Sequence, residues 1–190
     1  MHIPIRIAAR LLLGCAVAAA PAFAVAQAAP AKPAVGTQMT PSATYDKLLS
    51  GMEKEFVDAA EAMPEDKFNF SPTQGEFKGV RTFGGQVKHV AEANYYFFGA
   101  SEADTKAKGD ALKNLKTKAE IVQALKDSFT QAHTYVDSIT ADNAFIQTDN
   151  GTRAGQAAFG LAHFMDHYGQ MVEYLRMNGI VPPASRGGNM

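Results

Sequence analysis

Two histidines, His163 and His167, stand four residues apart near the C-terminal end of the chain. On a helix, positions four apart project from one face, one turn above each other. Both imidazoles can then reach one metal ion, which is why such pairs recur in zinc enzymes. A third histidine, His89, lies in another strongly helical segment, so packing two helices together assembles three ligands. Three protein ligands with an open fourth position are typical of a catalytic metal, whereas structural zinc sites are usually closed by four ligands.

The histidine pattern alone is a weak signal. A histidine pair at this spacing is more often two polar or half-buried side chains than a metal site. His89 lies beside a predicted apolar stripe, where a histidine can simply hydrogen-bond to a carbonyl group. Gly85 and Ala93, one turn away on either side, leave room for a partner helix and an ion to approach. The residue types and spacing therefore leave both interpretations open.

The residues that surround the pair favour the metal site. The string HFMDHYGQMVEYLRMNGIVPP resembles the last helix of the DinB (damage-inducible) family of metalloproteins, in which HxxxHxGQ precedes YLR, a glycine and a double proline. The matching residues here are His163, His167, Gly169, Gln170, Tyr174, Leu175, Arg176, Gly179, Pro182 and Pro183. The stretch from Arg81 to Phe98 resembles the family's second helix, whose histidine is the third ligand. The resemblance runs from Tyr45 to Ser185 and implies a metal held by His89, His163 and His167.

Apolar residues at three- and four-residue steps predict an all-α fold. The expected helices run from about Tyr45 to Met63, from Thr82 to Phe98, from Thr117 to about Ile139 and from Arg153 to Asn178. The lysine-rich residues 101–116 are predicted to be a solvated connection, and no segment has a credible strand pattern. The long connection 64–81 could line the mouth of a site. Residues 42–185 should therefore form a four-helix up-and-down bundle of the DinB type, with the site inside it.

The last predicted helix carries two apolar stripes instead of one. Leu161, Met165, Tyr168, Val172 and Leu175 form the first stripe, while His163, His167, Gln170 and Tyr174 form another on nearly the opposite side. A peripheral bundle helix usually buries an arc of about 100° or somewhat more. Two interpretations follow: one stripe faces the metal site and the other a partner in a homodimer, or the helix is central in an asymmetric bundle.

Residues 1–26 have the features of a secretory signal peptide. Arg6 and Arg10 precede an apolar run, and A-x-A sites predict cleavage after Ala24 or Ala26. The apolar run is too short for stable membrane insertion, so the mature protein is expected in the periplasm or outside the cell. A minor alternative is a lipoprotein cleaved at Cys15. Residues 27–41 should then form a flexible leader and residues 186–190 a flexible tail.

Signal cleavage limits the chemistry of the mature chain. It removes Cys15, the single cysteine, so any thiol in a reaction must arrive with a substrate. It also removes Arg6 and Arg10, which leaves 16 basic against 19 acidic residues and a net charge of −3. Without a basic stripe or run, nucleic-acid binding is not expected.

The predicted site could support several metals and reactions. Neutral imidazoles suit Zn, Ni, Fe or Cu, and an open position lowers the pKa of a bound water or thiol to near neutrality. Shared coordination at 2.0–2.1 Å places the three ligand nitrogens roughly 3–4 Å apart. Candidate residues for orienting ligands or water are Gln170, Asp166 and Glu92, although an exposed helix position is the more common role for the two carboxylates. Expected pocket residues are Tyr96, Phe159, Phe164 and Tyr174.

The resemblance also suggests a class of activity. The wider DinB family includes thiol-dependent transferases and isomerases, so the expectation is a metal-dependent transferase or hydrolase acting on an unknown small molecule or thiol. Export places this chain away from the thiols of the cytoplasm, which favours an alternative: a non-catalytic metal-binding or stress-related module. A third alternative is a structural or dimerising bundle whose histidines hold no metal.

Overall fold

The computed structural model describes residues 32–187, so the predicted signal peptide, the first residues of the leader and residues 188–190 lie outside the described residues. The chain divides after Thr37 into two units. Residues 32–37 contain a turn in which the Thr37 amide donates to the Ala34 carbonyl at 3.1 Å. The helical unit that follows carries the predicted site.

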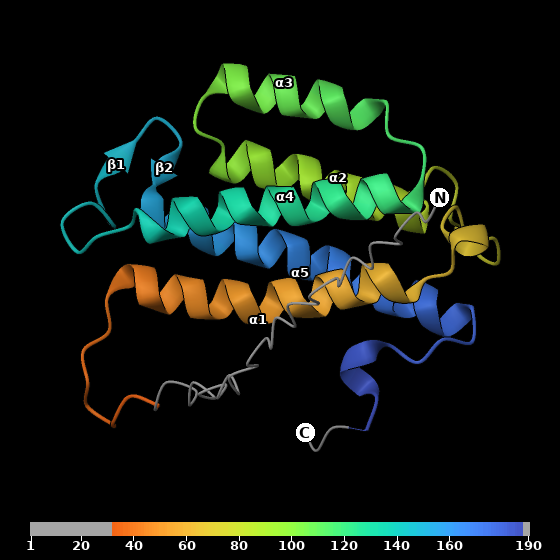
Figure 1. Ribbon diagram of the computed structural model, residues 1–190, viewed down its shortest axis with the longest axis horizontal. Helices are drawn as coiled ribbons and strands as arrows, with labels where there is room; N and C mark the ends of the chain where they lie inside the picture. Colours follow the sequence, from red (N-terminus) through yellow and green to blue (C-terminus); the bar gives the residue numbers. More distant parts are fainter. Residues whose placement is uncertain (1–31, 188–190) are drawn as a thin grey trace, which may run out of the picture. The chain divides into compact units, whose positions relative to one another are not determined.

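Five helices form the helical unit, as Figure 1 shows. They are α1 (Pro41–Ala62), α2 (Phe83–Phe98), α3 (Glu102–Lys113), α4 (Lys118–Asp137) and α5 (Arg153–Met177), with short 3-10 turns at Glu65–Lys67 and Pro183–Ser185. The all-α prediction is confirmed. Each helix begins where a threonine or serine side chain accepts a hydrogen bond from a backbone amide of the first turn. Thr117 and Glu120 form a capping box at the start of α4.

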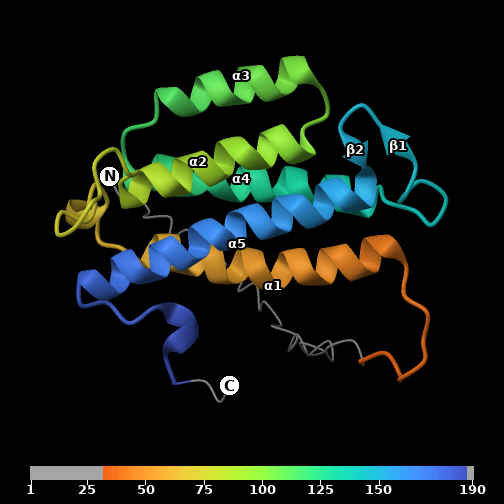
Figure 2. The same cartoon turned by 180° about the vertical axis from the view of Figure 1, so that it is seen from behind.

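The core consists of α1, α2, α4 and α5, and consecutive helices of the chain alternate in direction (Figures 1 and 2). Because α3 lies outside this core, α2 and α4 run in the same direction and pack against each other. Asn94 of α2 donates to the Ser128 hydroxyl at 3.1 Å, and Gln131 of α4 donates to the Phe98 carbonyl at 2.8 Å. In contrast, α5 runs antiparallel to α2, and this pair carries the histidines.

Helix α3 corrects the prediction that residues 101–116 are only a solvated connection. Its surface is polar, but Asp110 pairs with Lys106 at 2.6 Å and with Lys113 at 2.8 Å, within one helical turn. Such pairs favour a helix over an open coil. Leu112 is buried against the rest of the bundle. A single apolar anchor with charged neighbours gives too weak a periodic signal to be recognised as a helix.

A small hairpin corrects the expectation of no strands. β1 (Gln147–Thr148) pairs antiparallel with β2 (Gly151–Thr152), immediately before α5. Gly151 has a φ of +92°, the left-handed conformation that glycine adopts without strain and that hairpin bends of this kind require. Two residues on each side are too few to produce an alternating sequence pattern.

The two-stripe prediction for the last helix agrees with the position of α5. Leu161 and Leu175 are buried, and Met165 and Tyr168 pack against the core. Figure 2 shows α5 running between α1 and α2. Both stripes are thus covered within one chain, as the central-helix interpretation requires, and the homodimer stays a prediction. Among residues 32–187, none of the helices has the length and apolarity needed to cross a membrane.

Candidate metal centre

His89, His163 and His167 come together between α2 and α5. One ring nitrogen of each lies within 4.8 Å of those of the other two. The ring centroid of His89 is 5.2 Å from that of His163 and 4.7 Å from that of His167, and the last two are 4.7 Å apart. The limit of 4.8 Å is wider than the roughly 3–4 Å expected for coordinated nitrogens. The three side chains form a group that could hold a metal ion.

Close packing of α2 against α5 brings the histidines together. A Cβ atom added to Gly160, one turn before His163, would collide with the end of the buried Phe98 ring on α2. Gly160 therefore permits a helix approach that any larger residue would prevent. Gln156, one turn earlier, donates its side-chain amide to the Phe97 carbonyl at 2.8 Å and ties the end of α2 to α5.

The connection before α2 fixes the other end of the site. The backbone amides of Phe83 and Gly84 donate to the carbonyls of Phe70 and Phe68, at 2.8 and 2.7 Å. The Tyr174 hydroxyl of α5 donates to the Arg81 carbonyl at 3.2 Å. Tyr174 is thus buried and holds the chain just before α2, so its role here is structural support.

The environment favours neutral histidines. Burial, together with the positive charge of Arg81 and the two neighbouring imidazoles, lowers the pKa of His89 to about 4. Burial is also the largest influence on His163 and His167, and it lowers the pKa of both, against the opposing effect of Asp166. At neutral pH these side chains therefore present lone pairs, which is the form that binds a metal.

His167 is the most enclosed of the three, with 7% of its surface exposed. Its Nδ1 atom is buried without a hydrogen-bond partner among the described residues. Most buried polar atoms are hydrogen-bonded, so an unpaired one needs an explanation such as a bound water or ion. The residues present therefore fit a metal ion.

A chain of polar side chains lies one turn from the histidines. Gln86 of α2 donates to the side-chain oxygen of Gln170 at 2.7 Å, and Gln170 donates to Asp166 at 3.2 Å. Gln170 and Asp166, two of the predicted orienting residues, thus lie beside the site and bond to each other. Gln86 and Arg81 were not singled out from the sequence, because a glutamine or arginine at a helix start carries no motif by itself.

The third candidate, Glu92, is exposed on α2, and it lies on the side that faces α3. Its carboxylate would be 3.6 Å from a Cβ atom added to Gly109, and its charge acts on Lys113. The structure therefore does not bring Glu92 together with the histidines. Phe164 is fully buried and packs against Phe56 and Phe129 in the core.

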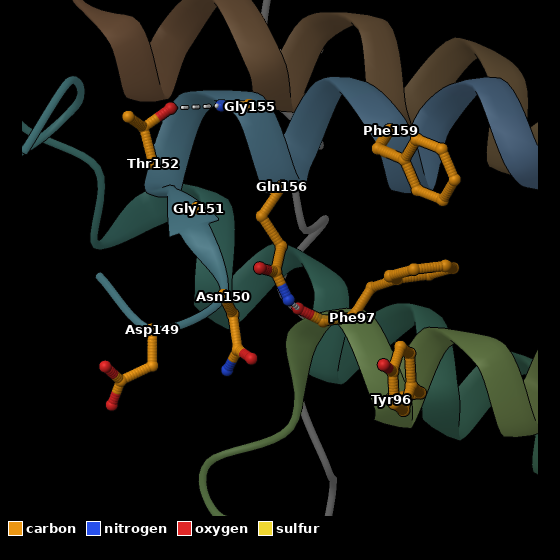
Figure 3. Close-up of a pocket in the computed structure, with 9 residues that line it drawn as sticks. All are labelled: Tyr96, Phe97, Asp149, Asn150, Gly151, Thr152, Gly155, Gln156 and Phe159. Atoms are coloured by element: carbon orange, nitrogen blue, oxygen red, sulfur yellow. Dashed lines mark hydrogen bonds between the residues drawn. The ribbon is translucent and has the colours of Figure 1, made fainter. Parts of the chain in front are cut away.

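Tyr96 and Phe159 lie on a cleft of about 500 Å³ between the end of α2, the hairpin and the start of α5, drawn in Figure 3. We call it the aromatic cleft; the lining residues used below are Tyr96, Phe97, Asp149, Asn150, Gln156 and Phe159. The ring of Phe97, which was not among the expected pocket residues, lies 5.4 Å from that of Phe159 and 5.2 Å from that of His163, between centroids. The cleft therefore adjoins the histidine group.

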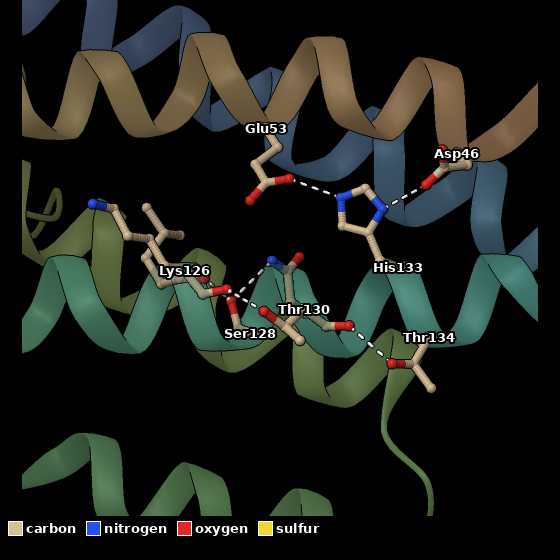
Figure 4. Close-up of polar contacts among 9 residues, drawn as sticks. Asp46, Glu53, Lys126, Ser128, Thr130, His133 and Thr134 are labelled. Carbon is tan, nitrogen blue, oxygen red and sulfur yellow. Dashed lines mark hydrogen bonds and ion pairs between the residues drawn. The ribbon is translucent and has the colours of Figure 1, made fainter. Parts of the chain in front are cut away.

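A fourth histidine, His133, is half-buried and joins two helices of the core. It lies on α4, away from the other histidines, and Figure 4 shows its two ring nitrogens bridging two carboxylates of α1. Nδ1 lies 2.6 Å from Asp46 and Nε2 lies 2.8 Å from Glu53. Partial burial lowers the pKa of His133, but the hydrogen bonds and charges of Glu53 and Asp46 outweigh it and raise the pKa overall.

Comparison with known proteins agrees with this fold. The sequence model of the DinB superfamily matches residues 48–171, a range that includes all three histidines of the site. Among solved structures, a protein from Exiguobacterium sibiricum described as a candidate DinB family member aligns with a TM-score of 0.56 and 17% sequence identity. The alignment covers 81% of this chain and 98% of that one. At this identity the likeness concerns the fold alone. No curated protein matches the chain.

Proposed function

This chain belongs to the DinB superfamily, and from that premise we propose that His89, His163 and His167 bind one divalent transition metal ion, Zn, Ni or Fe. The observation that supports the proposal most directly is the convergence of three neutral imidazoles from two helices. The unpaired Nδ1 atom of His167 adds support, because a bound ion would give this buried nitrogen a partner and so remove the free-energy cost of burying it unpaired.

The finer proposal is a metal-dependent transferase or hydrolase that acts on a small molecule. Three protein ligands leave a coordination position for a substrate or water. A bound ion would supply Lewis acidity, which activates a water or thiol near neutral pH. Because the mature chain has no cysteine after signal cleavage, a reacting thiol would come with the substrate.

The remaining residues of the site would position its parts. Gln86 and Gln170 join α2 to α5 one turn from the histidines and so hold the two halves of the ligand set together. Asp166 accepts from Gln170 and fixes the orientation of its amide. Arg81 brings a positive charge near all three histidines and so helps to keep them in the neutral form that binds a metal.

We propose that the protein is exported, on the basis of its N-terminal sequence. Residues 1–26 support export to the periplasm or the medium, with mature protein beginning at Val25 or Gln27. N-terminal sequencing of the protein from its native cells tests this. Retention of Met1, or a lipid on Cys15, would contradict it.

Elemental analysis of the purified protein tests the metal site. We expect about one metal ion per chain in the wild type and none in His167→Ala. His133→Gln is a matched control, because it removes a histidine of the same chain that lies outside the group. Equal metal content in His167→Ala and the wild type would contradict the proposal.

Turnover separates an enzyme from a binding module. The assay offers thiol-conjugation, ester and amide substrates to the metal-loaded protein, with and without a chelator. Chelator-sensitive turnover that His163→Ala abolishes supports the transferase or hydrolase. Stoichiometric metal without turnover would favour the non-catalytic module.

A further inference from the structure

We propose that the aromatic cleft binds the ring or comparable apolar group of a small-molecule substrate that carries no negative charge. This inference rests on the proposed metal function, because the cleft then places the substrate beside the ion. It assigns a substrate class to the site.

The size and lining of the cleft suit such a ligand. Its volume of about 500 Å³ falls within the range of small-molecule pockets, about 300–1,000 Å³. Tyr96 and Phe159 are 71% and 63% exposed although both are large aromatic side chains. Figure 3 shows both rings on the same side as that of Phe97, with the polar groups of Asp149 and Asn150 at the other end. One end thus offers faces and edges for stacking, and the other offers hydrogen bonds.

The cleft reaches the histidine group through Phe97. The Phe97 ring touches that of Phe159 on one side and that of His163 on the other, in edge-to-face arrangements. Phe159 precedes His163 by one helical turn on the same helix. A ligand group that stacks on Phe97 or Phe159 therefore lies next to the imidazole nearest the cleft.

The charges around the cleft disfavour an anion. Among the described residues that line the cleft, Asp149 is the only one with a formal charge at neutral pH. The guanidinium of Arg153 is engaged elsewhere: it lies over the Tyr135 ring, 4.8 Å from its centroid, and it donates to Ser138. Aromatic faces and a carboxylate together attract cations and tolerate neutral groups.

The start of α5 also borders the cleft, and a helix N-terminus can attract anions. Here two of its donors are already used. The Ala154 amide donates to the Ala144 carbonyl at 2.9 Å, and the Gly155 amide donates to the Thr152 hydroxyl at 3.0 Å. The protein's own oxygens thus occupy two of the positions that an anionic ligand would use.

Three ring compounds, one cationic, one neutral and one anionic, test the proposal. Benzyltrimethylammonium, benzyl alcohol and benzoate are titrated into the purified protein, and binding is followed by NMR chemical shifts. We expect the cation and the alcohol to bind with shifts at Tyr96, Phe97 and Phe159, and benzoate to bind roughly tenfold more weakly or not at all. Equal binding of all three would overturn the proposal.

Variants locate the binding. A double variant, Tyr96→Ala with Phe159→Ala, should weaken binding of the cation and the alcohol roughly tenfold. Phe145→Ala, which removes an 80% exposed aromatic ring outside the cleft, is the matched control and should change nothing. Asp149→Asn should weaken the cation alone. Unchanged binding in the double variant would overturn the proposal. A wild type that is a dimer and a double variant that is a monomer would also overturn it, because a second copy of the chain would then cover the cleft in the wild type.

The same titration with a chelator keeps the two proposals apart. Ring binding that persists in chelator shows that the cleft binds without the ion. Ring binding by a protein in which elemental analysis finds no metal supports the cleft and contradicts the metal function. A protein that holds one metal per chain but binds none of the ring compounds retains the metal function and overturns the cleft.

Discussion

The ring of Phe97 lies 5.2 Å, centroid to centroid, from the ring of His163, so one side chain borders both the aromatic cleft and the histidine group. Because Phe97 and His89 lie on α2 and His163 lies on α5, the spacing of these two helices sets both sites together. Anything that separates α2 from α5 should therefore disturb metal binding and ligand binding at once.

Chelation should lower the melting temperature of the wild type. An ion that binds only the folded state at a hundredfold excess over its dissociation constant adds about 2.7 kcal/mol, or roughly 5–10 °C for a chain of this length. Differential scanning fluorimetry with and without chelator measures the shift. His167→Ala, which lacks a ligand, should melt at the same temperature in both conditions. Chelator insensitivity of the wild type would leave only the structural bundle.

Replacing Gly160 with Ala should damage the site from a distance. The new Cβ would collide with the Phe98 ring, which is buried and has little room to move. Overpacking of this kind costs about 1–3 kcal/mol, and the helices must separate to relieve it. We expect a lower melting temperature and weaker metal binding, measured by competition with a coloured chelator. Gly169→Ala is the control, because a Cβ at Gly169 meets nothing within 4 Å.

The sequence predicted the parts of the fold that have long periodic patterns. The segment of α2 and the two stripes of α5 carried enough apolar residues at helical spacing to place His89, His163 and His167 on facing helices. Helix α3 was missed because its stability comes from Lys106, Asp110 and Lys113 and from one apolar anchor. Helices were predicted from periodic apolar stripes, and α3 has no such stripe.

Side-chain directions across helices were harder to predict. Glu92 shares a helix with His89 but faces α3, a helix that the sequence analysis did not expect. Tyr174 shares a face with His167 but uses its hydroxyl to hold the Arg81 carbonyl. The partners of His133, Asp46 and Glu53, lie 87 and 80 positions earlier in the chain. Only the packing of α1 against α4 reveals that bridge.

Replacing Gln170 with Ala should weaken the site without abolishing it. Gln170 bonds to Gln86 and Asp166, and no hydrogen bond to a histidine was found among the described residues. Loss of its link to α2 should cost about 1 kcal/mol of stability, measured by urea unfolding. Substitution of residues that surround the ligands of a metal site typically lowers metal affinity by about 10–100-fold. One metal per chain should therefore still bind when metal is in excess. Complete loss of metal at saturation would instead make Gln170 a ligand.

The bridge of His133 should make stability depend on pH. Asp46 and Glu53 raise the pKa of His133 in the folded state, so the folded state binds the proton more tightly than the unfolded chain. The stabilisation is therefore fully present below the unfolded pKa of about 6.5 and is lost as pH rises through the raised folded pKa. The lowered pKa values of the other three histidines act in the opposite sense, because the stability that these neutral side chains contribute is lost as pH falls.

Comparing the wild type with His133→Gln isolates the bridge, because the other histidines are the same in both proteins. With chelator present, the wild type should melt above the variant at pH 6, and the difference should shrink as pH rises above about 6.5. The double variant Asp46→Asn with Glu53→Gln should remove this trend, because an uncharged partner no longer favours the imidazolium. A difference in melting temperature that is constant or grows with pH would show that His133 acts through packing and neutral hydrogen bonds instead of charge.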